Sequence, residues 1–422
     1  MNIVSQFIQS SRGSKINVTL LFFYFVWMAA LISRSISGLD DFDVFFHAGK
    51  RILLKDDIYG QPYYNHLKFY YSPLFALLLS PFAGLPVTYV KIIWFLVNYI
   101  LLIRCVFIIR QYTVWNFKGS TFVLLFLCIC SGKVIMHNFL ANQMSILILW
   151  TMLESFRMYT ARNTVMAILL FCVGLNFKIL SIMVLPFYFI VNQIRFKMLF
   201  PAFTIMLLIV PAISISWHYN IFLLQQWWAG INPADQFHVI QTSEQGFVDL
   251  GSLVTRYLTS GRIVNEPLVN VINLGYGPIF LITNFIRLSL VLLTIAVVRN
   301  LKHHVYGVHR DLARIVPFIA MVPMVLPHQR DYSFLLVMPM LIVLVLFLCR
   351  LQKKGLYLLF CLSVIVSGLL AWSTILGSSV VEFFYSYRLI TIGMLSLFIL
   401  YLYVVNTVAQ RNFLISSQDV QK

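Results

Sequence analysis

Three carboxylates, Asp40, Asp41 and Asp43, lie within four residues of the sequence. They precede or open a segment whose apolar residues recur every three or four positions, which predicts a short amphipathic helix. Two uses are open to a carboxylate at the start of a helix. It can cap free backbone N–H groups, a contribution of about 1 kcal/mol. It can also act as a general base that takes a proton from a substrate hydroxyl.

The predicted amphipathic helix runs for about three turns. Its two faces are built from Phe42, Phe45, Phe46, Gly49 and Leu53 on the apolar side and from Asp43, His47, Lys50 and Arg51 on the polar side. Helices of this kind often lie in a membrane interface with the apolar face towards lipid. We therefore expect this one along the outer membrane surface.

Ionisable residues also stand at or near the ends of apolar segments. They are Lys133, His137, Lys178, Arg287 and the run His328-Gln329-Arg330-Asp331. Charges at membrane depth are costly and therefore point to function. Lys178 and Arg330 could simply extend their charges to the interface. Convergence of several cations would instead suit an anionic group such as a lipid phosphate.

A pair of tryptophans, Trp227-Trp228, follows Gln225-Gln226 in a long polar segment. Adjacent tryptophans are typical of a membrane interface. The alternative is a platform on which a sugar ring stacks, because an aromatic face binds C–H groups well. Further along, residues 250–258 are predicted to form a short helix with Arg256 exposed.

The composition identifies the environment of these residues. Of the 422 residues, 60% are apolar and 11% are charged, whereas soluble domains carry about 25% charged residues. A soluble enzyme, a disordered chain and a disulfide scaffold are therefore disfavoured. The net charge of +17 is interpreted against a membrane and not as a nucleic-acid signal. The six cysteines lie in apolar runs without zinc-site spacing, so no metal site is expected.

We predict an all-α polytopic membrane protein of about twelve transmembrane helices in a single domain, residues 1–422. The expected spans are 16–36, 87–110, 119–136, 139–157, 163–176, 179–193, 198–217, 270–298, 313–327, 332–350, 355–376 and 388–407. The apolar piece 73–85 is too short to cross a membrane and is predicted to be re-entrant or interfacial. Two long outer loops remain, at about 37–86 and 218–268.

The distribution of lysine and arginine predicts that both termini are cytoplasmic, in a multi-pass protein of the cell membrane. In this arrangement eleven of the fourteen acidic residues fall on the outer side. Acids do not decide orientation, but they concentrate carboxylates on one face of the protein.

Several of these residues fit one family pattern. Asp41-Phe42-x-Val44-Phe45-x-x-Ala48-Gly49, then Tyr59, then Tyr71-x-Pro73-Leu74-Phe75, resembles the first outer loop of glycosyltransferase family 87. Asn142-Gln143 is similar to a pair at the start of a span. Lys178 matches a Lys-Pro pair, but isoleucine replaces the proline. Residues 327–332 resemble a further motif only in part.

The resemblance implies a fold of the GT-C type and a mannosyltransferase-like activity. It implies a hexose donor carried on polyprenyl phosphate and a lipid-linked or glycan acceptor on the outer side. It also implies that Asp41 is the catalytic base, with Asp40 and Asp43 as the neighbouring alternatives. No cofactor and no nucleic acid are expected, and a metal is not required because a monophosphate leaving group carries less charge than a diphosphate.

With this chemistry, cations near the outer side would bind the donor phosphate, and we expect Lys178, His328 and Arg330 in that role. The sugar or the acceptor would lie against Asp43, His47, Tyr63, Trp227 and Trp228, with Tyr64 as the alternative to Tyr63. Three other classes remain open: a lipid or solute transporter or flippase, an inactive scaffold homologue, and a glycan polymerase or ligase. The absence of repeat symmetry disfavours the transporter.

Overall fold

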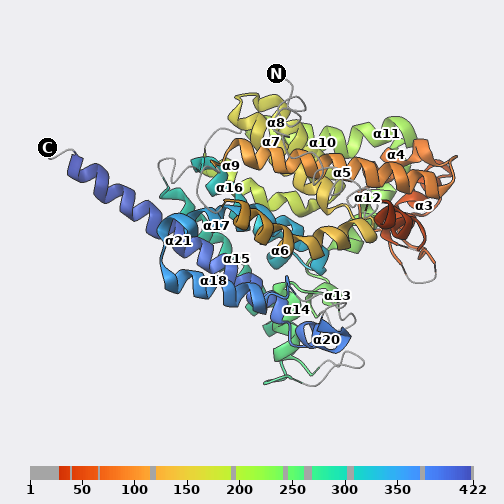
Figure 1. The fold of residues 1–422 in the computed structure, drawn as a ribbon. Helices are drawn as coiled ribbons and strands as arrows, with labels where there is room; N and C mark the ends of the chain where they lie inside the picture. Colours follow the sequence, from red (N-terminus) through yellow and green to blue (C-terminus); the bar gives the residue numbers. More distant parts are fainter. Residues whose placement is uncertain are drawn as a thin grey trace, which may run out of the picture.

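The computed structural model describes residues 28–38, 40–64, 67–114, 120–191, 196–240, 246–260, 269–301, 308–370 and 376–419. These residues form helices, and their only β pairings are isolated bridges (Figure 1). The first described helical residues are 28–36, so the beginning of the span expected at 16–36 lies outside the described part. The prediction of an all-α protein is confirmed.

The elements follow in chain order as α3 (Asp41–Leu53), α4 (Pro73–Leu79), η1 (Ser80–Phe82), α5 (Val87–Gln111), α6 (Ser120–Leu140), α7 (Ser145–Thr160), α8 (Thr164–Phe177), η2 (Ile179–Val184), α9 (Leu185–Ile190), α10 (Phe196–Thr204), η3 (Ile205–Ile209), α11 (Val210–Ile215), α12 (Trp217–Ile231), α13 (Gln236–Val239), α14 (Leu250–Leu258), α15 (Tyr276–Arg299), α16 (Arg310–Val325), η4 (Asp331–Val337), α17 (Met338–Leu351), α18 (Lys354–Val366), α20 (Ser378–Ser386) and α21 (Leu389–Asp419).

The core of the bundle is built around α16 and α17. All residues of α16 from Asp311 to Val325 are buried, and α16 packs against η4, α17, η2 and α21. A helix that is apolar nearly all round can be stable only when other elements surround it. Its two internal prolines, Pro317 and Pro323, each remove a backbone donor. Neighbouring elements can compensate for this loss within a membrane bundle.

Other helices expose apolar side chains to the outside of the bundle. On α15 the exposed stripe recurs at helical spacing and consists of Leu281, Phe285, Leu288 and Leu292, each more than half exposed. A continuous apolar stripe of this length would be unfavourable in water. It is the surface expected of a helix in contact with lipid, so the fold supports a multi-pass membrane protein.

The number of spans differs from the sequence prediction. Among the described residues five helices are long and apolar enough to cross a membrane, or six if α6 and α7, which bend by 115° at their junction, form one span. Helices occur at most of the predicted positions, but α8, η2–α9 and α18 are short. The expected count of about twelve is therefore not reproduced by helix length. The piece at 73–82 is short, as predicted.

Contacts between distant segments define two ends of the bundle. At the α3 end, Gln143 between α6 and α7 contacts Asp41, and Thr391 of α21 donates to the carbonyl of Val248 before α14 (2.7 Å). Helices α3, α13, α14 and α20 lie on this side, whereas the C-terminal part of α21 projects away from it (Figure 1). At the opposite end, the N–H of His309 donates to Tyr112 (2.9 Å).

Helix α3 forms where the sequence predicts it, but its surroundings are different. Phe42, Phe45 and Phe46 are buried. The rings of Phe45 and Phe75 lie 5.3 Å apart, and those of Phe42 and Trp94 also 5.3 Å apart. The apolar face therefore packs on α4 and α5 instead of on lipid, while the position of the helix along the outer membrane surface stays a prediction. The periodicity identified the buried face but not the partner that covers it.

Candidate active site at the α3 end

The first residue of α3, Asp41, is held by an amide from another part of the chain. The side-chain nitrogen Nε2 of Gln143 donates to Oδ2 of Asp41. Asp41 is partly exposed, and its other oxygen, Oδ1, has no hydrogen-bond partner within the described part of the chain. One oxygen is thus fixed in orientation while the other can accept a proton, which is the arrangement required of a general base.

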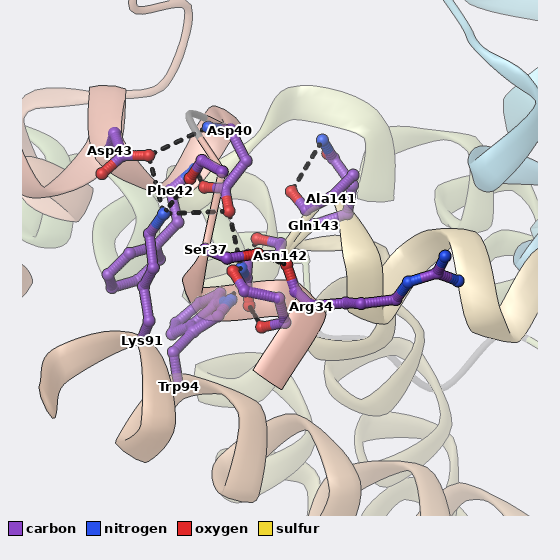
Figure 2. A network of polar contacts seen from close by, with 12 residues as sticks. Arg34, Ser37, Asp40, Phe42, Asp43, Lys91, Trp94, Ala141, Asn142 and Gln143 are labelled. Atoms are coloured by element: carbon purple, nitrogen blue, oxygen red, sulfur yellow. Dashed lines mark hydrogen bonds and ion pairs between the residues drawn. The ribbon is translucent and has the colours of Figure 1, made fainter. Parts of the chain in front are cut away.

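The two neighbouring acids are used within the protein. Asp40 is the N-cap of α3, and its Oδ1 accepts from the N–H of Phe42 (2.9 Å). Asp43 closes a capping box, because its Oδ2 accepts from the N–H of Asp40 (2.9 Å). The buried Lys91 of α5 lies 3.1 Å from Asp40 and 2.8 Å from Asp43. Figure 2 shows these contacts.

Two consecutive amide side chains bind the consecutive acids Asp40 and Asp41. Nδ2 of Asn142 donates to Oδ2 of Asp40 (2.7 Å), and its neighbour Gln143 donates to Asp41. Asn142 adopts a φ of 45°, a left-handed conformation that asparagine tolerates better than most residues. Burial raises the pKa of Asp40, opposed by the hydrogen bond from Asn142 and the charge of Lys91. The acids thus divide into two structural carboxylates and one available carboxylate, Asp41.

Lys178 lies close enough to this carboxylate for their charges to interact. It ends α8 in an extended conformation, and its Nζ lies 5.1 Å from the centroid of the Tyr71 ring. Among the described residues Nζ makes no hydrogen bond or ion pair. Burial lowers the pKa of Lys178 to about 8, and the charge of Asp41 acts in the opposite direction. The structure therefore brings a cation without a direct anionic partner within electrostatic range of the candidate base.

His328 joins the same region from the loop after α16. Burial lowers its pKa to about 3, and the charges of His238, Lys178 and Arg287 add to this effect. At neutral pH His328 is thus an uncharged imidazole near two cations. It forms a hydrogen bond with His238 and adopts a φ of 57°. Lys178 and His328 are thus within electrostatic range of each other, and His328 does not contribute a positive charge.

Arg287 adds a charge to this region from the middle of α15. Its Nη2 lies 3.9 Å from Oδ1 of Asp249, and neither Nη2 nor Nε has a hydrogen-bond partner among the described residues. Asp249 is the buried N-cap of α14 and accepts from the N–H groups of Gly251 (2.8 Å) and Ser252 (3.2 Å). An arginine with unsatisfied buried donors is able to bind an anion.

The remaining predicted residues have diverse surroundings. Tyr63 is buried under Arg51, and its hydroxyl donates to the carbonyl of Ile58 (3.1 Å), so its contacts are structural. His47 is half-buried with its ring 5.6 Å from that of Tyr64, and burial followed by the charge of Lys50 lowers its pKa. Arg330 is exposed and lies along Gly246.

The tryptophan pair divides between two environments. Trp227 is buried, and its Nε1 donates to the carbonyl of Tyr70 (3.0 Å). Trp228 is 57% exposed, as expected for a residue at an interface. Arg256 was expected to be exposed, but it is buried and its Nε donates to the carbonyl of Ser386 (2.8 Å).

A second polar cluster surrounds Asp331. Nδ1 of His137 lies 2.8 Å from Oδ1 of Asp331, and the hydroxyl of Tyr385 donates to Oδ2 of the same acid. Nζ of Lys133 lies 3.4 Å from the carbonyl of Gly368. The sequence identified three of these four side chains as candidates. It did not identify Lys91, although a lone lysine inside an apolar span was the signal that could have revealed it.

Within the described ranges, no group of three or more His, Cys, Asp or Glu side chains could hold a metal ion. The arrangement therefore consists of a helical membrane bundle with an available carboxylate, an unpaired ammonium and a neutral imidazole at one end. This combination defines a membrane protein with a candidate acid–base site beside a site for an anion.

Comparison with protein families supplies the class of reaction. Residues 69–327, well over half of the chain, match the model of glycosyltransferase family 87, and the protein belongs to this family. No curated protein and no solved structure matches the chain. The matched range includes Gln143, Lys178 and Trp227, whereas His328 lies one residue after it and Asp41 lies 28 residues before it. The protein is thus a membrane glycosyltransferase.

Proposed function

We propose that this glycosyltransferase moves a hexose from polyprenyl phosphate to a hydroxyl acceptor, with inversion, on the extracytoplasmic side of the cell membrane. The observation that carries the proposal is the partly exposed carboxylate of Asp41 within electrostatic range of the ammonium of Lys178. The carboxylate can remove the proton of the acceptor hydroxyl, and the ammonium can bind the negatively charged phosphate. Mannose is the proposed sugar, from the family resemblance.

The reaction is a single displacement. The acceptor oxygen attacks the anomeric carbon and loses its proton to Oδ1 of Asp41. The bond between the anomeric carbon and the phosphate oxygen breaks, and polyprenyl phosphate leaves with the electron pair. Because attack and departure occur on opposite faces of the carbon, the anomeric configuration inverts.

Two groups in the proposed site would stabilise the charge on the leaving phosphate. Lys178 supplies a full positive charge, and neutral His328 can act as a hydrogen-bond partner. Stabilisation of developing charge by fixed groups is often the largest catalytic effect, and removal of one donor costs about 2.7–4 kcal/mol in well-studied enzymes. Gln143 acts as a positioning residue, because it fixes the orientation of the Asp41 carboxylate.

The test uses membranes that contain the full chain and radiolabelled polyprenyl-phosphate sugars, supplied one at a time. We expect transfer from one donor, with Asp41→Asn slowing transfer by about 10²–10⁴-fold. Asp56→Asn is the matched control, because Asp56 is an exposed acid in the same loop. Undiminished transfer by Asp41→Asn would reject the assignment of the base. Movement of the labelled lipid across the membrane without sugar transfer would favour the transporter.

A further inference from the structure

A cavity of about 300 Å³ lies between the first long loop and the end of α12. Its lining includes Tyr59, Lys68, Gln226, Trp227, Asp235 and His238. The volume is at the lower end of the range of about 300–1,000 Å³ found for small-molecule sites. The cavity therefore has room for a small ligand or one unit of a larger one.

The walls of the cavity combine aromatic surface with polar side chains. The indole of Trp227 cannot turn freely, because its Nε1 donates to the carbonyl of Tyr70 (3.0 Å). Trp227 and Phe69 are buried, so the aromatic surface open to a ligand comes mainly from Tyr70, which is 38% exposed. An aromatic face binds the C–H groups of a sugar ring, while amide and carboxylate groups bind its hydroxyls. This lining is therefore typical of a carbohydrate site.

The charges at the cavity oppose one another. Lys68 and Asp235 both line it, and both are exposed. A negatively charged ligand would be repelled by Asp235, and a positively charged one by Lys68. The balance therefore favours an uncharged ligand over a phosphate or a uronic acid.

Two connections join the cavity to the candidate active site. Tyr70 lines the cavity, and the next residue, Tyr71, lies under the ammonium of Lys178. His238 also lines the cavity, and its Nδ1 shares a hydrogen bond with Nε2 of His328. The cavity is thus linked to Lys178 through the neighbouring residues Tyr70 and Tyr71, and to His328 through His238.

We propose that this cavity binds an uncharged saccharide unit of the acceptor. The assignment to the acceptor rests on the proposed function, in which Lys178 binds the donor phosphate and the acceptor needs a separate site. The saccharide would lie against the exposed Tyr70, with Gln226 and Asp235 bonded to its hydroxyls.

The experiment measures binding without catalysis. The probes are methyl α-D-mannopyranoside, methyl α-D-glucopyranoside and methyl α-D-galactopyranoside, and saturation-transfer NMR detects their binding to the purified full chain in detergent. We expect at least one glycoside to bind. Gln226→Ala removes one hydrogen-bonding amide and should weaken binding about threefold to tenfold. Gln225→Ala is the matched control, because this neighbouring glutamine is exposed and lies outside the lining.

Three further measurements make the result decisive. Methyl glucuronide should bind the unmodified chain more weakly than the best glycoside does, and Lys68→Gln, at an exposed position, should weaken its binding further because only the repulsion from Asp235 remains. Stronger binding of methyl glucuronide than of every glycoside would overturn the proposal. Binding of no glycoside, or equal loss in Gln225→Ala and Gln226→Ala, would overturn the proposal. Asp41→Asn should bind the glycoside as the unmodified chain does. Glycoside binding without transfer from any polyprenyl-phosphate sugar would reject the proposed function and leave the saccharide site in place.

Discussion

The three neighbouring acids show how surroundings assign different roles to one type of side chain. Asp40 and Asp43 are joined to the buried Lys91 and to the start of α3. Asp41 takes no part in that network and is bound only through Oδ2, by Gln143, among the described residues. A carboxylate that already holds a buried cation is a poor proton acceptor for a substrate. Asp41 is therefore the candidate base that the geometry favours.

At the residue scale, Lys178 gives the site a predictable response to pH. Its pKa is lowered to about 8 because burial disfavours the charged form. The ammonium is therefore protonated below this pH and loses its charge as the pH rises through it. If Lys178 binds the donor phosphate, the KM for the donor should rise above about pH 8. Initial rates at several donor concentrations between pH 6 and pH 10 measure this change.

The control for this prediction is Lys178→Arg. A guanidinium keeps its charge far above pH 8, so the variant should lack the rise in donor KM at high pH, even if its KM at pH 7 is altered. A rise that is identical in the two proteins would show that another group titrates.

At the scale of elements, α3 is fixed to α5 by Lys91. Lys91→Met should destabilise the protein by about 3–5 kcal/mol, because it leaves two buried carboxylates without their cation. Thermal unfolding in detergent measures the loss, and Lys354→Met, at an exposed lysine, should have little effect. Adding Asp43→Asn to Lys91→Met should restore part of the stability. Equal stability of Lys91→Met and the unmodified chain would contradict this account.

The contact between α3 and α4 depends on Gly49. A Cβ at this position would lie 3.1 Å from the backbone carbon of Leu79 and 3.2 Å from the carbonyl oxygen of Ala76. Gly49→Ala should therefore push the helices apart and cost about 1–3 kcal/mol, the usual cost of overpacking. Gly84→Ala is the control, because its added Cβ would meet no atom within 4 Å. Similar melting temperatures for the two variants would show that the helices can adjust.

Local sequence patterns predicted much of this architecture, but the rest depends on contacts between residues far apart in the sequence. The spacing of the phenylalanines predicted α3, and the lone lysines and histidines at the ends of apolar segments indicated the polar end. No local pattern could show that Gln143 reaches Asp41 or that His238 meets His328, since these pairs are 102 and 90 residues apart. The break at Lys178 falls between the predicted spans 163–176 and 179–193, whereas the helix predicted at 355–376 was too long, because α18 ends at Val366 although the apolar sequence continues.

At the scale of the whole molecule, polar function is concentrated at one end. Asp41, Lys178, His328 and the saccharide cavity all belong to the α3 end, whereas Arg104, Arg157 and Glu154 form a separate ion-paired group near the end of α7. A transporter needs polar sites that are accessible from both sides. A site confined to one end instead suits a reaction at one membrane surface, which is the arrangement of a glycosyltransferase with a lipid-borne donor.

This asymmetry leads to a test of sidedness. The bias of lysine and arginine predicts that the α3 end faces the outside. In a variant whose six cysteines are replaced, Lys68→Cys and Lys354→Cys are matched changes at exposed lysines near opposite ends. A membrane-impermeant maleimide should label Lys68→Cys in intact cells and Lys354→Cys only after lysis, because a charged reagent cannot cross the lipid. The reverse pattern would place the candidate base in the cytoplasm, where an extracytoplasmic acceptor could not reach it.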